Sequence, residues 1–166
     1  MKRFIILILF TLSVSMYVHA QNYHEIGLRA GGTSGFTFRT VNPNGSALEG
    51  IVGLWDHGVS FTALYEIHFQ AFDVNGLNWF YGGGVHVVFY GADYERNTEP
   101  SWHSNYPPYV DYGTFGLGLD GTIGIEYKIP EIPITVSFEF KPFIEFISSN
   151  NMWFSMDPGL GIRFVF

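Results

Sequence analysis

Four side chains that could exchange protons or bind a metal ion stand out in this sequence: Glu66, His68, His86 and Glu126. A carboxylate beside an imidazole can act as an acid–base pair or supply metal ligands. The alternative is a polar network that fills the interior of the protein, because buried polar groups need partners. The chain has no Cys and no closely spaced His ligand motif. We therefore expect a polar network, with no metal or other cofactor.

Further charged residues could line a path for ions. The alternative is that opposite charges pair across a narrow interior and close it. A barrel of eight strands usually leaves room only for side chains, so we expect closure. The residues in question are Glu139, Lys141, Glu145, Arg29, Arg39 and Arg163.

A Ser–His–acid set would make the chain a candidate lipid-modifying enzyme. Ser101, His103 and Ser104 lie near Glu99. No nucleophile-elbow motif surrounds these serines, and nothing in the sequence holds the four residues in a fixed geometry. We therefore expect a non-catalytic protein.

The same segment, residues 91–112, is rich in aromatic side chains. Exposed aromatic residues in loops make good binding contacts. The alternative is a lid over one end of the fold, or an anchor at a lipid interface. The candidate binding residues are Tyr94, Trp102, Tyr106, Tyr109 and Tyr112.

The elements that carry these side chains are expected to be strands, because apolar residues recur with a period of two. From Phe115 to Tyr127, for example, one face is apolar and the other alternates Gly with polar residues. Turn-forming residues separate such runs. Eight strands are predicted, at 23–31, 35–42, 46–55, 59–72, 77–91, 112–128, 134–147 and 152–166.

The first 20 of the 166 residues read as a cleaved signal peptide. Lys2 and Arg3 precede an apolar stretch, and Ala20 is a suitable cleavage site. Loss of these two cations leaves 6 Lys and Arg against 15 Asp and Glu, so the formal net charge falls from −7 to −9. Such an acidic chain does not favour nucleic acid. Residues 21–166 are expected to form one domain.

Several features predict that the apolar face points outward, into lipid. It is too bulky for the narrow interior of an eight-stranded barrel. The opposite face carries Gly and charges, and charges facing lipid would cost a few kcal/mol each. Aromatic residues near strand ends are typical of interfacial girdles, and these are Trp55, Trp79, Tyr81, Tyr127 and Trp153. The expected interior network consists of Glu25, Arg29, Arg39, Glu49, Glu66, His68, His86, Asp120, Glu126, Glu139, Lys141, Glu145, Asp157 and Arg163.

With these features, residues 21–166 resemble small bacterial outer-membrane β-barrel proteins of the OmpA/OmpX type. The last strand matches that family, with Leu160, Ile162, Phe164 and Phe166 on one face. The resemblance implies an all-β, closed, antiparallel up-and-down transmembrane barrel in the outer membrane. It also implies that Phe164 and Phe166 contribute to the signal read by the barrel-assembly machinery.

The resulting hypothesis is a structural or surface-binding outer-membrane barrel. Its expected partners are outer-membrane lipid, the assembly machinery and an extracellular ligand or surface. Three alternatives stay open: an outer-membrane lipid-modifying enzyme, a narrow channel, and a secreted soluble barrel that binds an apolar ligand.

Replacing Trp102, Tyr106 and Tyr109 with Ser tests the binding hypothesis. We expect attachment to host surfaces to weaken, because Ser removes most of the contact area that an aromatic ring offers. Attachment of cells that carry the variant is compared with that of cells carrying the parent. Unchanged attachment would contradict a binding role for the loop.

Overall fold

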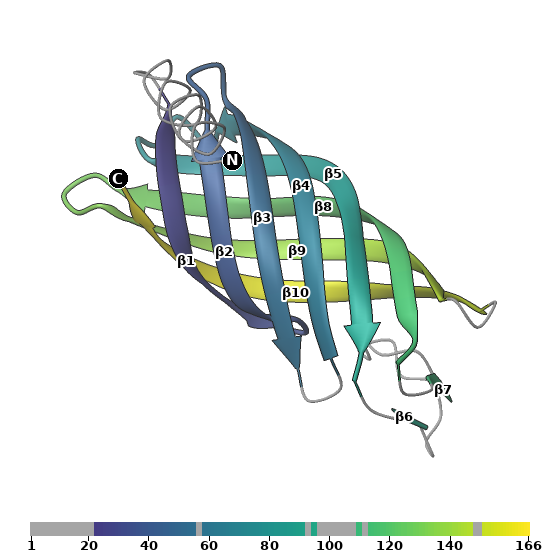
Figure 1. Ribbon diagram of the computed structural model, residues 1–166. Helices are drawn as coiled ribbons and strands as arrows, with labels where there is room; N and C mark the ends of the chain where they lie inside the picture. The colour runs from purple at the N-terminus through teal and green to yellow at the C-terminus, as the bar shows by residue number, and fades with distance from the viewer. Residues whose placement is uncertain (1–21, 56–57, 92–93, 96–108, 111–112, 148–150) are drawn as a thin grey trace, which may run out of the picture.

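Eight long strands form one closed antiparallel barrel, in the order β1-β10-β9-β8-β5-β4-β3-β2 (Figure 1). The computed structural model describes residues 22–55, 58–91, 94–95, 109–110, 113–147 and 151–166. The barrel strands are β1 (Tyr23–Gly31), β2 (Ser34–Val41), β3 (Ser46–Trp55), β4 (Gly58–Gln70), β5 (Leu77–Tyr90), β8 (Phe115–Ile129), β9 (Ile134–Ile147) and β10 (Asn151–Val165). The predicted all-β class and closed eight-stranded barrel are thereby confirmed.

Two predicted strand ends differ from the structure by more than one residue. The strand predicted at 59–72 stops at Gln70, because Phe72 and Asp73 have φ angles of 52° and 54°. This left-handed backbone turns the chain instead of extending it. The strand predicted from residue 112 begins at Phe115, after a turn at Gly113 with φ 78°.

A short pair of strands was not predicted. β6 (Tyr94–Glu95) and β7 (Tyr109–Val110) pair with each other in a separate sheet between β5 and β8. Figure 1 shows this pair beyond one end of the barrel, while the C-terminus and the β2–β3, β4–β5 and β8–β9 turns lie at the other end.

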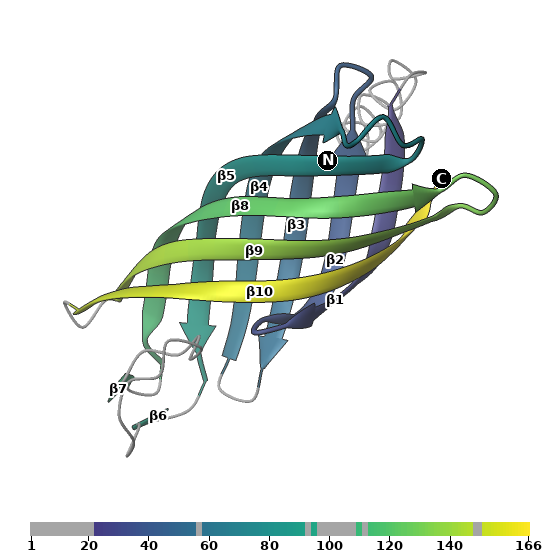
Figure 2. The ribbon, with the colours of Figure 1, turned by 180° about the vertical axis from the view of Figure 1, so that it is seen from behind.

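Pairing of the first and last strands closes the barrel, as Figure 2 shows from behind. The main-chain N–H of His24 donates to Phe166 O at 3.0 Å, and the N–H of Phe166 donates to His24 O at 2.9 Å. Each of the eight strands therefore has two hydrogen-bonded neighbours, and the barrel has no open edge. No helix in the described part of the chain is long and apolar enough to cross a bilayer.

The two faces of the wall have opposite polarity. Leu119 is 59% exposed and Phe61 48% exposed on the outside, whereas Glu49 and Glu139 on the inside are fully buried. Alternation along each strand produces this separation, because successive side chains point to opposite faces. Apolar residues therefore cover the outside of the barrel, and the charged residues lie inside it together with a few apolar side chains such as Phe80.

The aromatic residues predicted to form a girdle divide between the two faces. Trp79, Tyr81 and Tyr127 are exposed on the outside. Trp153 is the exception, because its position in β10 faces inward and it packs against the interior cluster formed by Val88, Tyr90 and Ile147. Its assignment to an outer girdle was therefore wrong. The side chain of Trp55 lies outside the described residues.

Several inward-facing glycines make room for interior side chains. A Cβ atom on Gly159 would lie 2.6 Å from the guanidinium carbon of Arg29, and one on Gly118 would collide with the His86 ring. Because a real Cβ does not approach so closely, a larger residue at either position would displace the charged partner. The glycines thus allow a narrow barrel to hold long charged side chains.

One interruption breaks the hydrogen-bonded ladder between β8 and β9. The ladder runs from Gly116 to Asp120 and resumes at Ile123, so Gly121 and Thr122 lack partners in it. Pro142 lies opposite Gly121, and proline has no N–H to donate. On its other side, β9 pairs with β10 without a gap. The N–H that Pro142 lacks would therefore have pointed toward β8.

The substitution Pro142→Ala should restore this part of the ladder. We expect the new amide at position 142 to exchange slowly with solvent, and the barrel to gain about 1 kcal/mol, the net contribution of one hydrogen bond. Hydrogen exchange and urea unfolding in detergent micelles measure the two effects. Pro130→Ala is the matched control: Pro130 is an exposed residue of the β8–β9 turn, beyond the last ladder pair Ile129–Ile134, so its new N–H would gain no ladder partner. Fast exchange at residue 142 would contradict this explanation of the gap.

Candidate functional site

The chemistry-bearing side chains of the described residues gather inside the barrel. Eight buried carboxylates face four Arg or Lys side chains and two His side chains, with all fourteen taking part in ion pairs. Acidic groups are therefore in excess even if both His are protonated. The fourteen are the predicted interior residues: Glu25, Arg29, Arg39, Glu49, Glu66, His68, His86, Asp120, Glu126, Glu139, Lys141, Glu145, Asp157 and Arg163.

The first group, here the Arg39 cluster, lies toward the end of the barrel where the C-terminus is found. Arg39 of β2 lies 2.6 Å from Glu25 of β1 and 3.4 Å from Glu66 of β4, and it also pairs with Glu126 of β8. His68 bridges Glu66 at 3.2 Å and Glu126 at 3.1 Å. One guanidinium thus joins carboxylates from three other strands, across the interior.

The second group begins with two further arginines. Arg29 of β1 lies 2.5 Å from Glu139 of β9 and 3.2 Å from Asp157 of β10. Arg163 of β10 lies 2.6 Å from Glu49 of β3 and 3.6 Å from Glu139. Because Glu139 contacts both cations, the four strands are linked through one carboxylate.

The same chain of ion pairs continues toward the β6–β7 end. Lys141 lies 3.4 Å from Asp157 and 3.5 Å from Asp120. His86 then bridges Asp120 at 2.8 Å and Glu145 at 3.2 Å. These contacts and those of Arg29 and Arg163 form one continuous path of charge through the barrel, here called the long network.

Both bridging histidines use their two ring nitrogens. His86 directs Nδ1 at Asp120 and Nε2 at Glu145, and His68 directs its nitrogens at Glu126 and Glu66. A neutral imidazole has a single N–H, so it can donate to only one of two carboxylates. Only the doubly protonated ring can donate on both sides. The geometry therefore fits imidazolium ions that hold pairs of carboxylates together.

One arrangement resembles a catalytic set that the sequence analysis did not consider. Ser60 and His86 line the same small cavity, and Ser60 Oγ has no hydrogen-bond partner among the described residues. However, both nitrogens of His86 already face carboxylate oxygens, so neither is free to accept a proton from Ser60. The cavity measures about 20 Å³, which is enough for about one water molecule but not for a substrate. The arrangement therefore does not favour catalysis.

The other sequence-predicted sites are only partly described. Of the loop candidates, Tyr94 and Tyr109 contribute main chain to β6 and β7, but their side chains lie outside the described residues. The same holds for the whole of Trp102, Tyr106 and Tyr112, the loop residues Glu99, Ser101, His103 and Ser104, and the predicted signal peptide at 1–20. Among the described residues, no group of three or more His, Asp or Glu is arranged to hold a metal ion.

The predicted assembly residues lie at the closing strand. Phe164 points outward from β10 and is 51% exposed, and Phe166 is 60% exposed beside the start of β1. His24 lies beside Phe166, with ring centroids 5.8 Å apart. Comparison with protein-family models, curated proteins and solved structures finds no match.

The Arg39 cluster predicts a large effect for Arg39→Gln. Three buried carboxylates would lose their shared cation, and breaking a buried ion pair commonly costs about 3–5 kcal/mol. We expect the urea concentration at the midpoint of unfolding to fall when unfolding is monitored by tryptophan fluorescence. Adding Glu126→Gln should recover part of the loss, because it removes one unpaired charge.

Lys128→Gln provides the matched control, because Lys128 lies over the Tyr23 ring at 3.8 Å and has no ion pair among those found in the described residues. A cation–π contact at such a site contributes about 1 kcal/mol. Equal losses for the Arg39 and Lys128 variants would show that the cluster does not stabilise the barrel specifically.

Proposed function

We propose that this chain is a non-catalytic barrel of a bacterial outer membrane, sealed by its charged interior and with a structural or surface-binding role through the loop at 91–112. The observation that carries the proposal is the inverted distribution of polarity. Apolar side chains cover the outside of the barrel, while charged side chains occupy its interior.

The exterior supports contact with lipid. Large hydrophobic side chains on every barrel strand are exposed, for example Leu28 at 54%, Leu48 at 59% and Leu160 at 58%. Monomeric soluble proteins rarely expose continuous apolar patches of more than a few hundred Å². Closure of the strands also suits lipid, because an open sheet would leave main-chain groups without partners there.

The interior argues against the secreted carrier and against the channel. A carrier of apolar ligands needs an apolar cavity, but the described interior holds ion pairs on eight strands. Those ion pairs also cross the lumen and obstruct a path for ions. The engaged nitrogens of His86 weigh against a catalytic pair of Ser60 and His86. The loop residues on which the alternative of a lipid-modifying enzyme rests lie outside the described residues.

The proposed binding role rests on the position of the loop between β5 and β8. Connections without long strands or helices that exceed about 12–15 residues are uncommon and are often functional. β6 and β7 belong to the longest connection of the barrel and lie at the end opposite the C-terminus, so this end would face the outside of the cell in barrels of this type, whose longer loops are extracellular (Figure 1).

Leu119→Arg tests the membrane proposal. An Arg near the middle of the lipid-facing wall should cost about 2–4 kcal/mol. We therefore expect less barrel in the outer-membrane fraction and a weaker heat-dependent shift in gel mobility than for the parent chain. Val74→Arg adds the same charge at an exposed residue of the β4–β5 turn and should leave both measurements unchanged.

The parent chain is tested by the same fractionation and mobility measurements, and also for conductance. Recovery in the outer membrane with a heat-dependent shift, and without discrete conductance steps in planar bilayers, is the expected result. Recovery as a soluble protein would overturn the membrane proposal, and regular conductance steps would replace the sealed barrel with a channel.

A further inference from the structure

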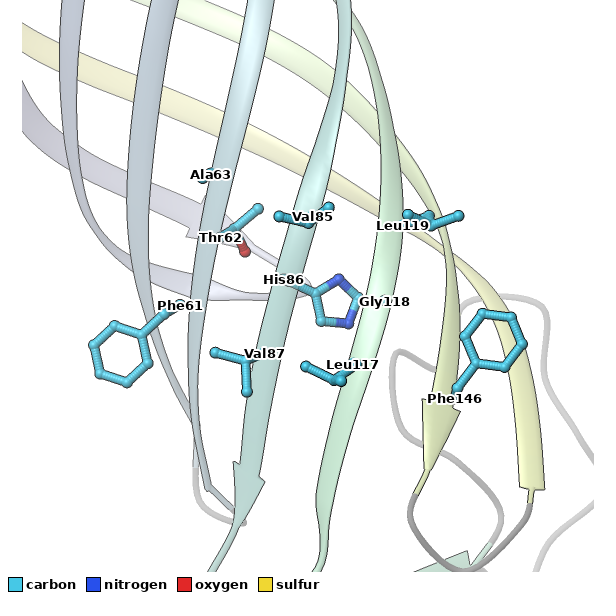
Figure 3. A pocket seen from close by; sticks show the side chains of 10 residues that line it. All are labelled: Phe61, Thr62, Ala63, Val85, His86, Val87, Leu117, Gly118, Leu119 and Phe146. Atoms are coloured by element: carbon cyan, nitrogen blue, oxygen red, sulfur yellow. The ribbon is translucent and has the colours of Figure 1, made fainter.

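The outer wall contains an apolar groove of about 550 Å³ that runs across β4, β5, β8 and β9 (Figure 3). One row of its lining residues is set by strand register, since Phe61 pairs with Val87, Val87 with Leu117, and Leu117 with Phe146. Phenylalanine rings therefore stand at both ends of the row, and the shorter Val87 and Leu117 lie between them.

A second row makes the groove wider on one side. In this row Ala63 pairs with Val85, and Val85 pairs with Leu119. Each of the three lies two residues away from the first-row residue on its own strand. Ala63 has the smallest of these outward side chains, so it leaves a hollow next to Phe61. None of the outward side chains that line the two rows is polar or charged.

We infer that this groove binds one hydrocarbon chain of a membrane lipid, which deepens the proposed function and rests on it. Without outward polar groups the groove offers no hydrogen bond to a headgroup, a sugar or a peptide main chain. A hydrocarbon chain needs none. The ligand class is therefore an acyl chain, recognised by shape.

The length of the groove fits such a chain. Four neighbouring strands are separated by three steps of about 4.8 Å, so the row from Phe61 to Phe146 spans roughly 14 Å. One leaflet provides about half of a hydrocarbon core that is about 30 Å thick. A single extended acyl chain of one leaflet is therefore long enough to reach from one phenylalanine ring to the other.

Shape favours this occupant over a second copy of the protein. The wall of another barrel is convex and carries bulky side chains, so it would rest on Phe61 and Phe146 rather than reach Val87 between them. Lipid and protein are equally apolar, so selectivity in a membrane comes from packing contacts. A flexible chain can make those contacts along the whole floor.

Photocrosslinking tests the inference with phosphatidylethanolamine that carries a diazirine in its palmitoyl chain. The full-length barrel is reconstituted in bilayers of unlabelled lipid, irradiated, and mapped by peptide mass spectrometry. We expect crosslinks concentrated on β5 and β8 around Val87 and Leu117. Unlabelled phosphatidylethanolamine and phosphatidylglycerol with the same chains should compete equally, because the headgroup is not recognised.

Ala63→Phe fills the hollow and should lower these crosslinks about fivefold. Ala30→Phe is the matched control, because Ala30 is also an exposed outward alanine, but in β1 and away from the groove. Val85→Phe serves as a second filling variant if the first does not fold. The heat-dependent mobility shift, measured on each sample, reports whether the barrel has inserted.

The outcomes separate this inference from the proposed function. A parent barrel that does not insert into bilayers overturns both. Two results for an inserted barrel would overturn only the inference that the groove binds an acyl chain. One is uniform labelling of all strands, and the other is equal labelling of the Ala63→Phe and Ala30→Phe variants. A change in dimer content with the filling variants, without loss of lipid crosslinks, would identify a second copy as the occupant and also reject the acyl chain.

Discussion

Ion pairing across the barrel interior is the interaction on which the rest of this structure depends. Buried charge is costly unless it is paired, and the interior holds more carboxylates than Arg and Lys side chains. Arg39 satisfies three carboxylates from other strands, and Glu139 joins Arg29 to Arg163. Strands that are not hydrogen-bonded neighbours are thereby connected. This network also explains why inward positions such as Gly118 and Gly159 lack side chains.

The charged interior also determines the polarity of the outer surface. Because each strand alternates, apolar residues that cannot enter the interior must cover the outside. A closed barrel with this surface suits lipid, and variation in side-chain size then shapes the surface itself. Phe61 and Phe146 stand above Val87, so the same register that closes the wall also forms a groove in it.

Much of the fold was predictable from the sequence, and the exceptions have local causes. The period of two identified all eight strands, and the inward positions of the charged residues followed from it. The end of β4 was missed because the left-handed backbone at Phe72 and Asp73 has no clear sequence signal in residues other than Gly or Asn. Trp153 was misassigned because an aromatic residue near a strand end suits either face, and here it packs against Val88 inside.

The sequence by itself determined the class of fold, the number of strands and the division between an apolar and a charged face, because these depend on the local alternation of residues. Only the tertiary structure decided which charges meet, since Arg29 and Glu139, or His68 and Glu126, are distant in the chain. It also decided that His86 is held by two carboxylates rather than left free to act on Ser60. The reason is that partners across a barrel depend on closure and register, which no single strand contains.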